Sequence, residues 1–256
     1  MIMSRFVHFS WKFCLFTFLF AALLACKTYY SPVENKGMLT TLDSTMASDP
    51  AALDIIEPYK KAIDIEMNEI ICFSEVAITK NQPEGLLNNF VSDLVLYMVN
   101  TYYNENEPYD VAIFNNGGLR AALPKGLIRV EDVYKLMPFE NEIVVLTITS
   151  EAFLSMISYI INSGGVPFAG MRIVSKQLKL ESLTINSIPF DESRNYTVVT
   201  SDYLAAGGDK MAFFQNPVEY RSISVLMRDL IIDYLREQNA EGNSLHPTLD
   251  GRIVYE

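Results

Sequence analysis

The chain has 256 residues, half of them hydrophobic, and carries 20 Lys and Arg against 31 Asp and Glu, a formal net charge of −11. This length and apolar content are enough for one sizeable hydrophobic core. The acidic balance excludes nucleic acid as an expected partner, because no basic stripe is present to neutralise phosphates. Small anionic ligands are compatible with it, since one arginine outweighs a diffuse acidic surface at close range.

Residues 1–25 are typical of a secretory signal peptide. Arg5 and Lys12 precede an apolar run from Phe13 to Ala25, and that run of 13 residues is shorter than the roughly 20 that a spanning helix needs. Leu-Leu-Ala before Cys26 resembles the bacterial lipobox, which implies cleavage before Cys26 and lipid attachment to it. An uncleaved signal anchor is the alternative.

We therefore expect a membrane-anchored lipoprotein of the cell envelope, facing the periplasm or the exterior. Removing residues 1–25 takes away Arg5, Lys12 and no acids, so the formal charge of −11 becomes −13. Cys72 is then the one cysteine besides Cys26, which excludes an internal disulfide. Residues 26–48 are expected to be a tether, and residues 49–256 a folded domain.

The first part of that domain alternates helical and strand-like patterns. Asp49-Pro50 predicts an N-cap and first helical residue, and Pro58 is expected to kink or split the helix. The patterns that follow predict a strand at Ile70–Thr79, a helix at Leu86–Tyr103, a short buried strand at Val111–Phe114 and a helix at Val130–Met137.

The second part continues the mixture. We expect a strand at Ile143–Thr149, a helix capped by Thr149 or Ser150 and ended by Ser163-Gly164-Gly165, strands at Met171–Lys176, Leu183–Ile185 and Tyr196–Thr200, a helix at Ile223–Arg236 and a closing edge strand at Arg252–Tyr255. Because the elements do not alternate strictly as βαβ units, the pattern favours an α+β fold with a mixed β-sheet flanked by helices.

Two glycine-bearing stretches, Phe114–Arg120 and Asp202–Asp209, follow strand-like runs. Glycines let backbone N–H groups approach a polar ligand, and the neighbouring Asn, Arg and Asp supply directional hydrogen bonds. The chain here resembles the C-terminal, substrate-recognition domain of 5′-nucleotidases. The similar motifs are Asn115-Asn116-Gly117-Gly118-Leu119-Arg120, Met137-Pro138-Phe139-Glu140-Asn141, the stretch Asp202–Asp209, and Glu84 with Asn88-Asn89-Phe90 and Asp93.

The resemblance implies a substrate-binding set and a role for each member. A guanidinium and an amide would contact phosphate, two aromatic rings would sandwich a base, and a carboxylate would accept hydrogen bonds from ribose. The expected residues are Asn115, Gly117, Gly118, Arg120, Phe139, Tyr203 and Asp209. Taken singly, each suits a plainer role: Arg120 a surface ion pair, the glycines a turn, Phe139 a core plug, Tyr203 a buried rim residue and Asp209 a turn cap. Their ordered occurrence favours the binding site.

Two departures from the family pattern bear on function. The family has a further arginine near the position of Asn81, where this chain has only Lys80 close by. The resemblance does not extend to the family's metallophosphoesterase half, and His246 is the single histidine after residue 25. We expect no catalytic residue, metal site or cofactor in this chain, with divalent metals on a partner phosphoesterase. Cys72, flanked by apolar residues, is expected to be inert packing.

Three functions are compatible with these residues. The leading hypothesis is the nucleotide- or nucleoside-recognising half of a split 5′-nucleotidase-type phosphohydrolase, which needs a separately encoded metallophosphoesterase for catalysis. The alternative is a non-catalytic, membrane-tethered nucleoside- or nucleotide-binding lipoprotein. A third is a structural interaction module with a vestigial pocket.

Overall fold

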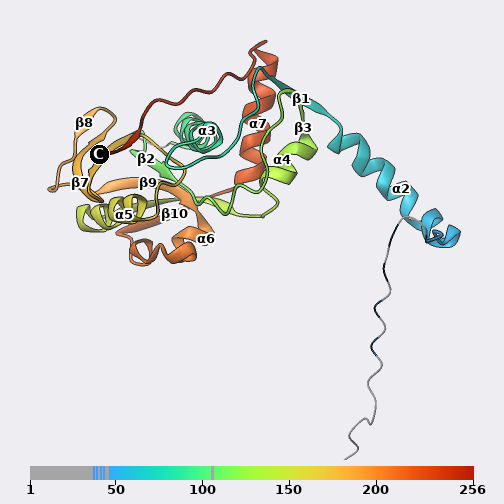
Figure 1. The fold of residues 1–256 in the computed structure, drawn as a ribbon, viewed down its shortest axis with the longest axis horizontal. Coiled ribbons are helices and arrows are strands. Elements are labelled where there is room, and N and C mark those ends of the chain that lie inside the picture. The colour runs from blue at the N-terminus through green and yellow to red at the C-terminus, as the bar shows by residue number, and fades with distance from the viewer. Residues whose placement is uncertain (1–36, 38, 40, 42, 44–45, 105–106) are drawn as a thin grey trace, which may run out of the picture. The chain divides into compact units, whose positions relative to one another are not determined.

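The structure is a computed structural model that describes residues 37, 39, 41, 43, 46–104 and 107–256 (Figure 1). Residues 51–256 form one compact unit, and the fold below is that of this unit. The expected signal peptide, Cys26 and most of the expected tether lie outside the described residues. Within the described part, no helix has the length and apolar character needed to cross a bilayer.

The first elements are α2 (Pro50–Met67), β1 (Ile70–Ser74) and α3 (Leu86–Tyr102). The expected split at Pro58 is not found, because α2 runs continuously through it. The strand predicted over residues 70–79 ends earlier, since Ser74 Oγ donates to the carbonyl of Val76 in a turn. Ile78 then forms only an isolated bridge with Leu123.

A five-stranded mixed sheet organises the domain, in the order β10-β4-β9-β2-β5. Its strands are β2 (Val111–Ile113), β4 (Glu142–Ile148), β5 (Phe168–Ala169), β9 (Tyr196–Ser201) and β10 (Glu219–Leu226). The central pair, β2 and β9, is parallel, whereas the other neighbours are antiparallel. Because parallel strands bring equivalent ends to the same edge, the segments that follow β2 and β9 lie at one edge of the sheet.

Helices cover both faces of this sheet (Figure 1). One core contains Val145 and Val199 from the sheet and the apolar faces of α3, α4 (Val130–Leu136) and α7 (Met227–Ala240). The other contains Val144 and Val198 with the apolar stripe of α5 (Ser150–Asn162). Successive residues of one strand thus pack into opposite cores, because side chains alternate between the two faces of a sheet.

The remaining strands form two smaller sheets. β1 pairs with β3 (Gly126–Arg129), and β11 (Ile253–Tyr255), β6 (Met171–Lys176), β7 (Lys179–Ile185) and β8 (Ile188–Pro189) form a four-stranded sheet. Short helical turns α6 (Asp202–Ala205), η1 (Gly208–Lys210) and η2 (Ala212–Phe214) follow β9. The predicted α+β architecture with mixed sheets and flanking helices is confirmed.

The last helix begins later than the sequence predicts. Residues 223–226 were expected to open it, but they belong to β10, and α7 begins at Met227. The residues Glu219 to Ser222 pair with β4, and Ser224 has a φ of 55°, which no helix accommodates. Pairing with a neighbouring strand therefore overrides the local apolar pattern. The predicted cap of α5 is confirmed, because Thr149 Oγ1 accepts from the N–H of Ala152.

Candidate functional site

The two glycine-bearing stretches lie side by side because the strands before them are parallel neighbours. β2 leads into residues 114–120, and β9 leads into residues 202–209. A cavity of about 340 Å³ opens at this edge of the sheet. It is lined by all seven residues singled out in the sequence, Asn115, Gly117, Gly118, Arg120, Phe139, Tyr203 and Asp209, together with Asn141.

Two glycines are required by close contacts at this edge. A Cβ on Gly118 would lie 2.7 Å from Asn115 Oδ1, and a Cβ on Gly208 would lie 2.5 Å from the ring of Tyr203. Both distances are far below van der Waals contact, so the absence of a side chain lets the polar and aromatic groups approach the backbone. The glycines therefore shape the walls of the cavity.

Asp209 is the centre of a small hydrogen-bond network. Asn115 Nδ2 donates to one carboxylate oxygen, and Tyr203 OH donates to the other at 3.0 Å. Tyr159 OH donates to the backbone carbonyl of Asp209 at 3.0 Å. Burial, with the nearby charge of Asp209, raises the pKa of Tyr159, so this phenol stays a donor. Each carboxylate oxygen has two lone pairs, so Asp209 can still accept hydrogen bonds from a ligand diol.

Two aromatic rings and one guanidinium that border the cavity belong to exposed residues. Phe139 and Tyr203 are 42% and 46% exposed, and within the described part of the chain their rings do not pair with each other. The N–H of Arg120 donates to the carbonyl of Leu136 at 2.8 Å, while no side-chain partner of its guanidinium occurs among the described residues. Two open aromatic faces and one open cation thus border one small cavity.

A second layer holds the first glycine stretch in place. Lys80 Nζ donates to the carbonyls of Leu119 at 2.9 Å and Asn116 at 3.3 Å. The side chain of Asn116 donates to the carbonyl of Gly165 at 2.9 Å and accepts from Asn88 Nδ2 at 2.8 Å. Lys80, which lies near the position of the family's further arginine, therefore stabilises the backbone of the first glycine stretch.

The segment that carries Phe139 is fastened to the start of α7. The N–H of Met227 donates to the carbonyl of Asn141 at 2.9 Å, and Arg228 Nη1 donates to the carbonyl of Phe139 at 3.4 Å. The buried guanidinium of Arg228 also lies 4.3 Å above the ring of Tyr134 on α4. These contacts set the position of the first aromatic wall.

The upstream acidic residues of the resemblance have structural partners. Glu84 Oε1 accepts from Asn89 Nδ2 at 2.6 Å and from the N–H of Asp250 at 2.9 Å. Asp93 forms a bidentate pair with Arg252, with both N–O distances at 2.8 Å. These contacts attach the C-terminal segment to α3.

The surroundings of Cys72 and His246 do not indicate a nucleophile or a metal ligand among the described residues. Cys72 is buried, and burial raises the pKa of its thiol, which agrees with the predicted packing role. His246 is exposed, with Nδ1 3.2 Å from a carboxylate oxygen of Glu75. Among the described residues, no group of three or more His, Cys, Asp or Glu side chains is arranged to hold a metal ion.

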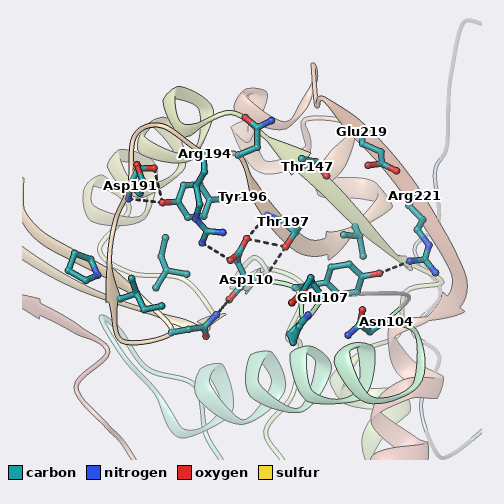
Figure 2. Close-up of a pocket in the computed structure, with 18 residues that line it drawn as sticks. Asn104, Glu107, Asp110, Thr147, Asp191, Arg194, Tyr196, Thr197, Glu219 and Arg221 are labelled. Carbon is teal, nitrogen blue, oxygen red and sulfur yellow. Dashed lines mark hydrogen bonds and ion pairs between the residues drawn. The ribbon is translucent and has the colours of Figure 1, made fainter.

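A larger cavity, of about 700 Å³, lies at the opposite ends of β2 and β9 (Figure 2). Its buried centre is Asp110, which accepts from Arg194 Nη2 at 2.8 Å and from the N–H of Thr197 at 2.8 Å. The Arg194 guanidinium lies 4.1 Å above the ring of Tyr196. No motif pointed to this cavity, because its lining comes from segments that are far apart in the sequence.

Both the sequence and the fold are similar to those of known proteins. A family model described as 5′-nucleotidase, C-terminal domain, matches residues 66–216. A trifunctional nucleotide phosphoesterase of Bacillus subtilis is 25% identical over 250 residues, covering 86% of this chain and 17% of that protein. A 5′-nucleotidase of Vibrio vulnificus is 24% identical over 233 residues, covering 87% of this chain and 40% of that protein.

The solved structures agree on the fold. A 5′-nucleotidase precursor of Thermus thermophilus superposes with a TM-score of 0.68 at 22% identity, covering 80% of this chain and 43% of the other. The NAD nucleotidase of Haemophilus influenzae gives a TM-score of 0.62 at 19% identity, covering 81% and 41%. The chain spans less than half the length of these relatives. Since the family model matches more than half of the chain, the chain belongs to the 5′-nucleotidase C-terminal domain family.

Proposed function

We propose that this chain is the nucleotide-recognising half of a split 5′-nucleotidase-type phosphohydrolase, with a metallophosphoesterase on a separate polypeptide supplying the metals and the hydrolytic step. The observation that carries the proposal is the convergence of Arg120, Phe139, Tyr203 and Asp209 on one cavity beside the glycine-shaped backbone. Membership of the family supports a nucleotide-related role for that cavity.

Each wall of the cavity has a distinct task in this proposal. The rings of Phe139 and Tyr203 hold the base between them, and Asp209 accepts hydrogen bonds from the ribose hydroxyls. Arg120 and Asn115 hold the phosphate, because a guanidinium offers forked donors to phosphate oxygens. The chain binds and orients the nucleoside monophosphate, and the partner breaks the phosphate ester. The proposed lipid on Cys26 keeps this binding half at the membrane.

The test combines the full chain with a separately produced metallophosphoesterase of this family, AMP and a divalent metal. We expect phosphate release to be faster with both proteins than with the phosphoesterase alone. A chain carrying Tyr203→Ala is the matched control, since it should restore little of the gain. Equal rates with and without the chain would overturn the split-enzyme proposal.

The same proteins and ligands distinguish the split enzyme from a non-catalytic binding lipoprotein. AMP or adenosine that binds to the chain in calorimetry without any partner-dependent turnover would identify a non-catalytic binding lipoprotein. Absence of binding at saturating ligand would instead leave the cavity without a recognition role.

A further inference from the structure

The edge strand β10 has an exposed segment that is not used by the proposed nucleotide site. β10 is the outermost strand of the five-stranded sheet on the β4 side. Val218 and Tyr220 are 58% and 54% exposed, and Glu219 and Ser222 are exposed as well. An open strand edge presents unpaired backbone N–H and C=O groups, to which another strand can add.

The segment available for pairing has clear limits. Pro217 precedes it and has no N–H to donate. At the other end, the register with β4 shifts after Ser222, and Ser224 has a φ of 55°. The regular part of β10 is therefore Glu219–Ser222, and no other strand of the described residues pairs with its outer edge.

The charges of this stretch are complementary to those of the same stretch in a second copy of the chain. Glu219 and Arg221 are two residues apart and both line the cavity of Figure 2, so they project from the same face of β10. In an antiparallel pair centred on Tyr220, Glu219 of each copy lies opposite Arg221 of the other. Opposite charges at facing positions stabilise an antiparallel pair.

The same charges select the register. A shift that places Glu219 on the two-fold axis brings the two Glu219 carboxylates together, and a shift that places Arg221 there brings two guanidinium groups together. Both arrangements are disfavoured because like charges lie directly opposite each other. The guanidinium of Arg221 donates to Tyr109 OH and, at 3.2 Å, to the carbonyl of Tyr103, and these contacts fix the direction in which the side chain leaves β10.

We propose that the chain forms a two-fold dimer through antiparallel pairing of Glu219–Arg221 of β10 with the same residues of a second copy. The Tyr220 side chains then face each other across the axis on the other side of the sheet. A single strand pair buries less surface than the roughly 1,200–2,000 Å² of stable complexes, so the dimer is a weak one. At a membrane, lipid anchoring would raise the local concentration of the two copies.

Sedimentation velocity of the full chain over micromolar to sub-millimolar concentrations tests the dimer. The unmodified chain is expected to shift from monomer to dimer, and Glu219→Arg is expected to weaken association by about tenfold or more. Glu219 has no internal partner among the described residues, so this variant should fold normally. Monomer at every concentration for the unmodified chain would overturn the proposal.

Mixing two charge variants gives the sharpest result. Glu219→Arg leaves two cations in the stretch, and Arg221→Glu leaves two anions, so each alone should be monomeric while the mixture forms a heterodimer. If Arg221→Glu fails to fold, Arg221→Gln replaces it and should pair with Glu219→Arg better than Glu219→Arg pairs with itself. A mixture no more associated than its components would contradict the proposed register.

Cross-linking locates the axis. Tyr220→Cys should form an inter-chain disulfide under mild oxidation, whereas Ser158→Cys, an exposed position on α5, should not. Equal cross-linking of the two variants would show random collision and overturn the proposed pairing.

Discussion

The two ends of the β2–β9 pair carry similar residue types and use them differently. At the amino ends, Asp110, Arg194 and Thr197 bind one another, so the charges are neutralised within the protein. At the carboxyl ends, no side-chain partner of Arg120 occurs among the described residues, and two aromatic rings remain open. The smaller cavity is therefore the better candidate for ligand binding, although the other is about twice its volume.

The comparison predicts that a change at the amino ends costs stability, while a change at the carboxyl ends costs affinity. Asp110→Ala should lower the free energy of unfolding by about 2–3 kcal/mol, because it leaves the Thr197 N–H and the Arg194 guanidinium without their acceptor. Urea denaturation measures this effect. Nucleotide affinity of the folded fraction should not change, and Asp191→Ala at the exposed rim should cost less stability, because among the described residues its carboxylate bonds only Ser193 of the same exposed turn.

At the carboxyl ends, removal of either ring should lower ligand affinity and change stability little. Phe139→Ala and Tyr203→Ala should each weaken AMP and adenosine binding by about 1–3 kcal/mol, by analogy with base stacking in nucleic-acid complexes. Stability should fall little, since both rings are already about half exposed. Calorimetry and thermal unfolding of the same samples separate the two effects. A large loss of stability with unchanged affinity would make these rings part of the core.

Variants of Arg120 test whether this side chain contacts the phosphate of the ligand. Arg120→Met should weaken AMP binding by about 1.5 kcal/mol, the low end for a hydrogen bond to a charged group, because the side chain is exposed. Adenosine, which has no phosphate, should bind with unchanged affinity. Arg120→Lys should recover only part of the AMP affinity, since an ammonium lacks the planar fork. An equal loss for both ligands would contradict a phosphate role.

The smallest effect is expected at Lys80. Lys80→Met removes two hydrogen bonds to the loop backbone, of which one is exposed, and should cost about 1 kcal/mol of stability. Hydrogen exchange should increase at residues 116–119 before other parts of the domain. If Lys80 instead contacted phosphate, the variant would lower AMP affinity and leave exchange unchanged.

Much of the fold and the lining of the candidate site could be predicted from sequence. Helix α5 was predictable because Thr149 and Gly164 mark its ends and its apolar stripe is regular. Six of the seven residues predicted for the site line one cavity because their motifs follow two strands that are parallel neighbours, and Phe139 reaches it from the segment before β4.

The failures share one cause. The start of α7 was misplaced because Ile223, Val225 and Leu226 continue its helical spacing, whereas β10 runs on to Leu226, which pairs with Glu142 of β4. The Asp110 network was missed because Asp110 and Arg194 are 84 residues apart and belong to no motif. Contacts between distant segments decided both, and a local pattern does not report them.

A crystal structure of the full chain with bound AMP tests the central claim most directly. The account predicts the base between Phe139 and Tyr203, the ribose hydroxyls on Asp209 and the phosphate beside Arg120. AMP bound in the cavity of Asp110 and Arg194, or no AMP bound to a chain soaked at saturating concentration, would contradict it.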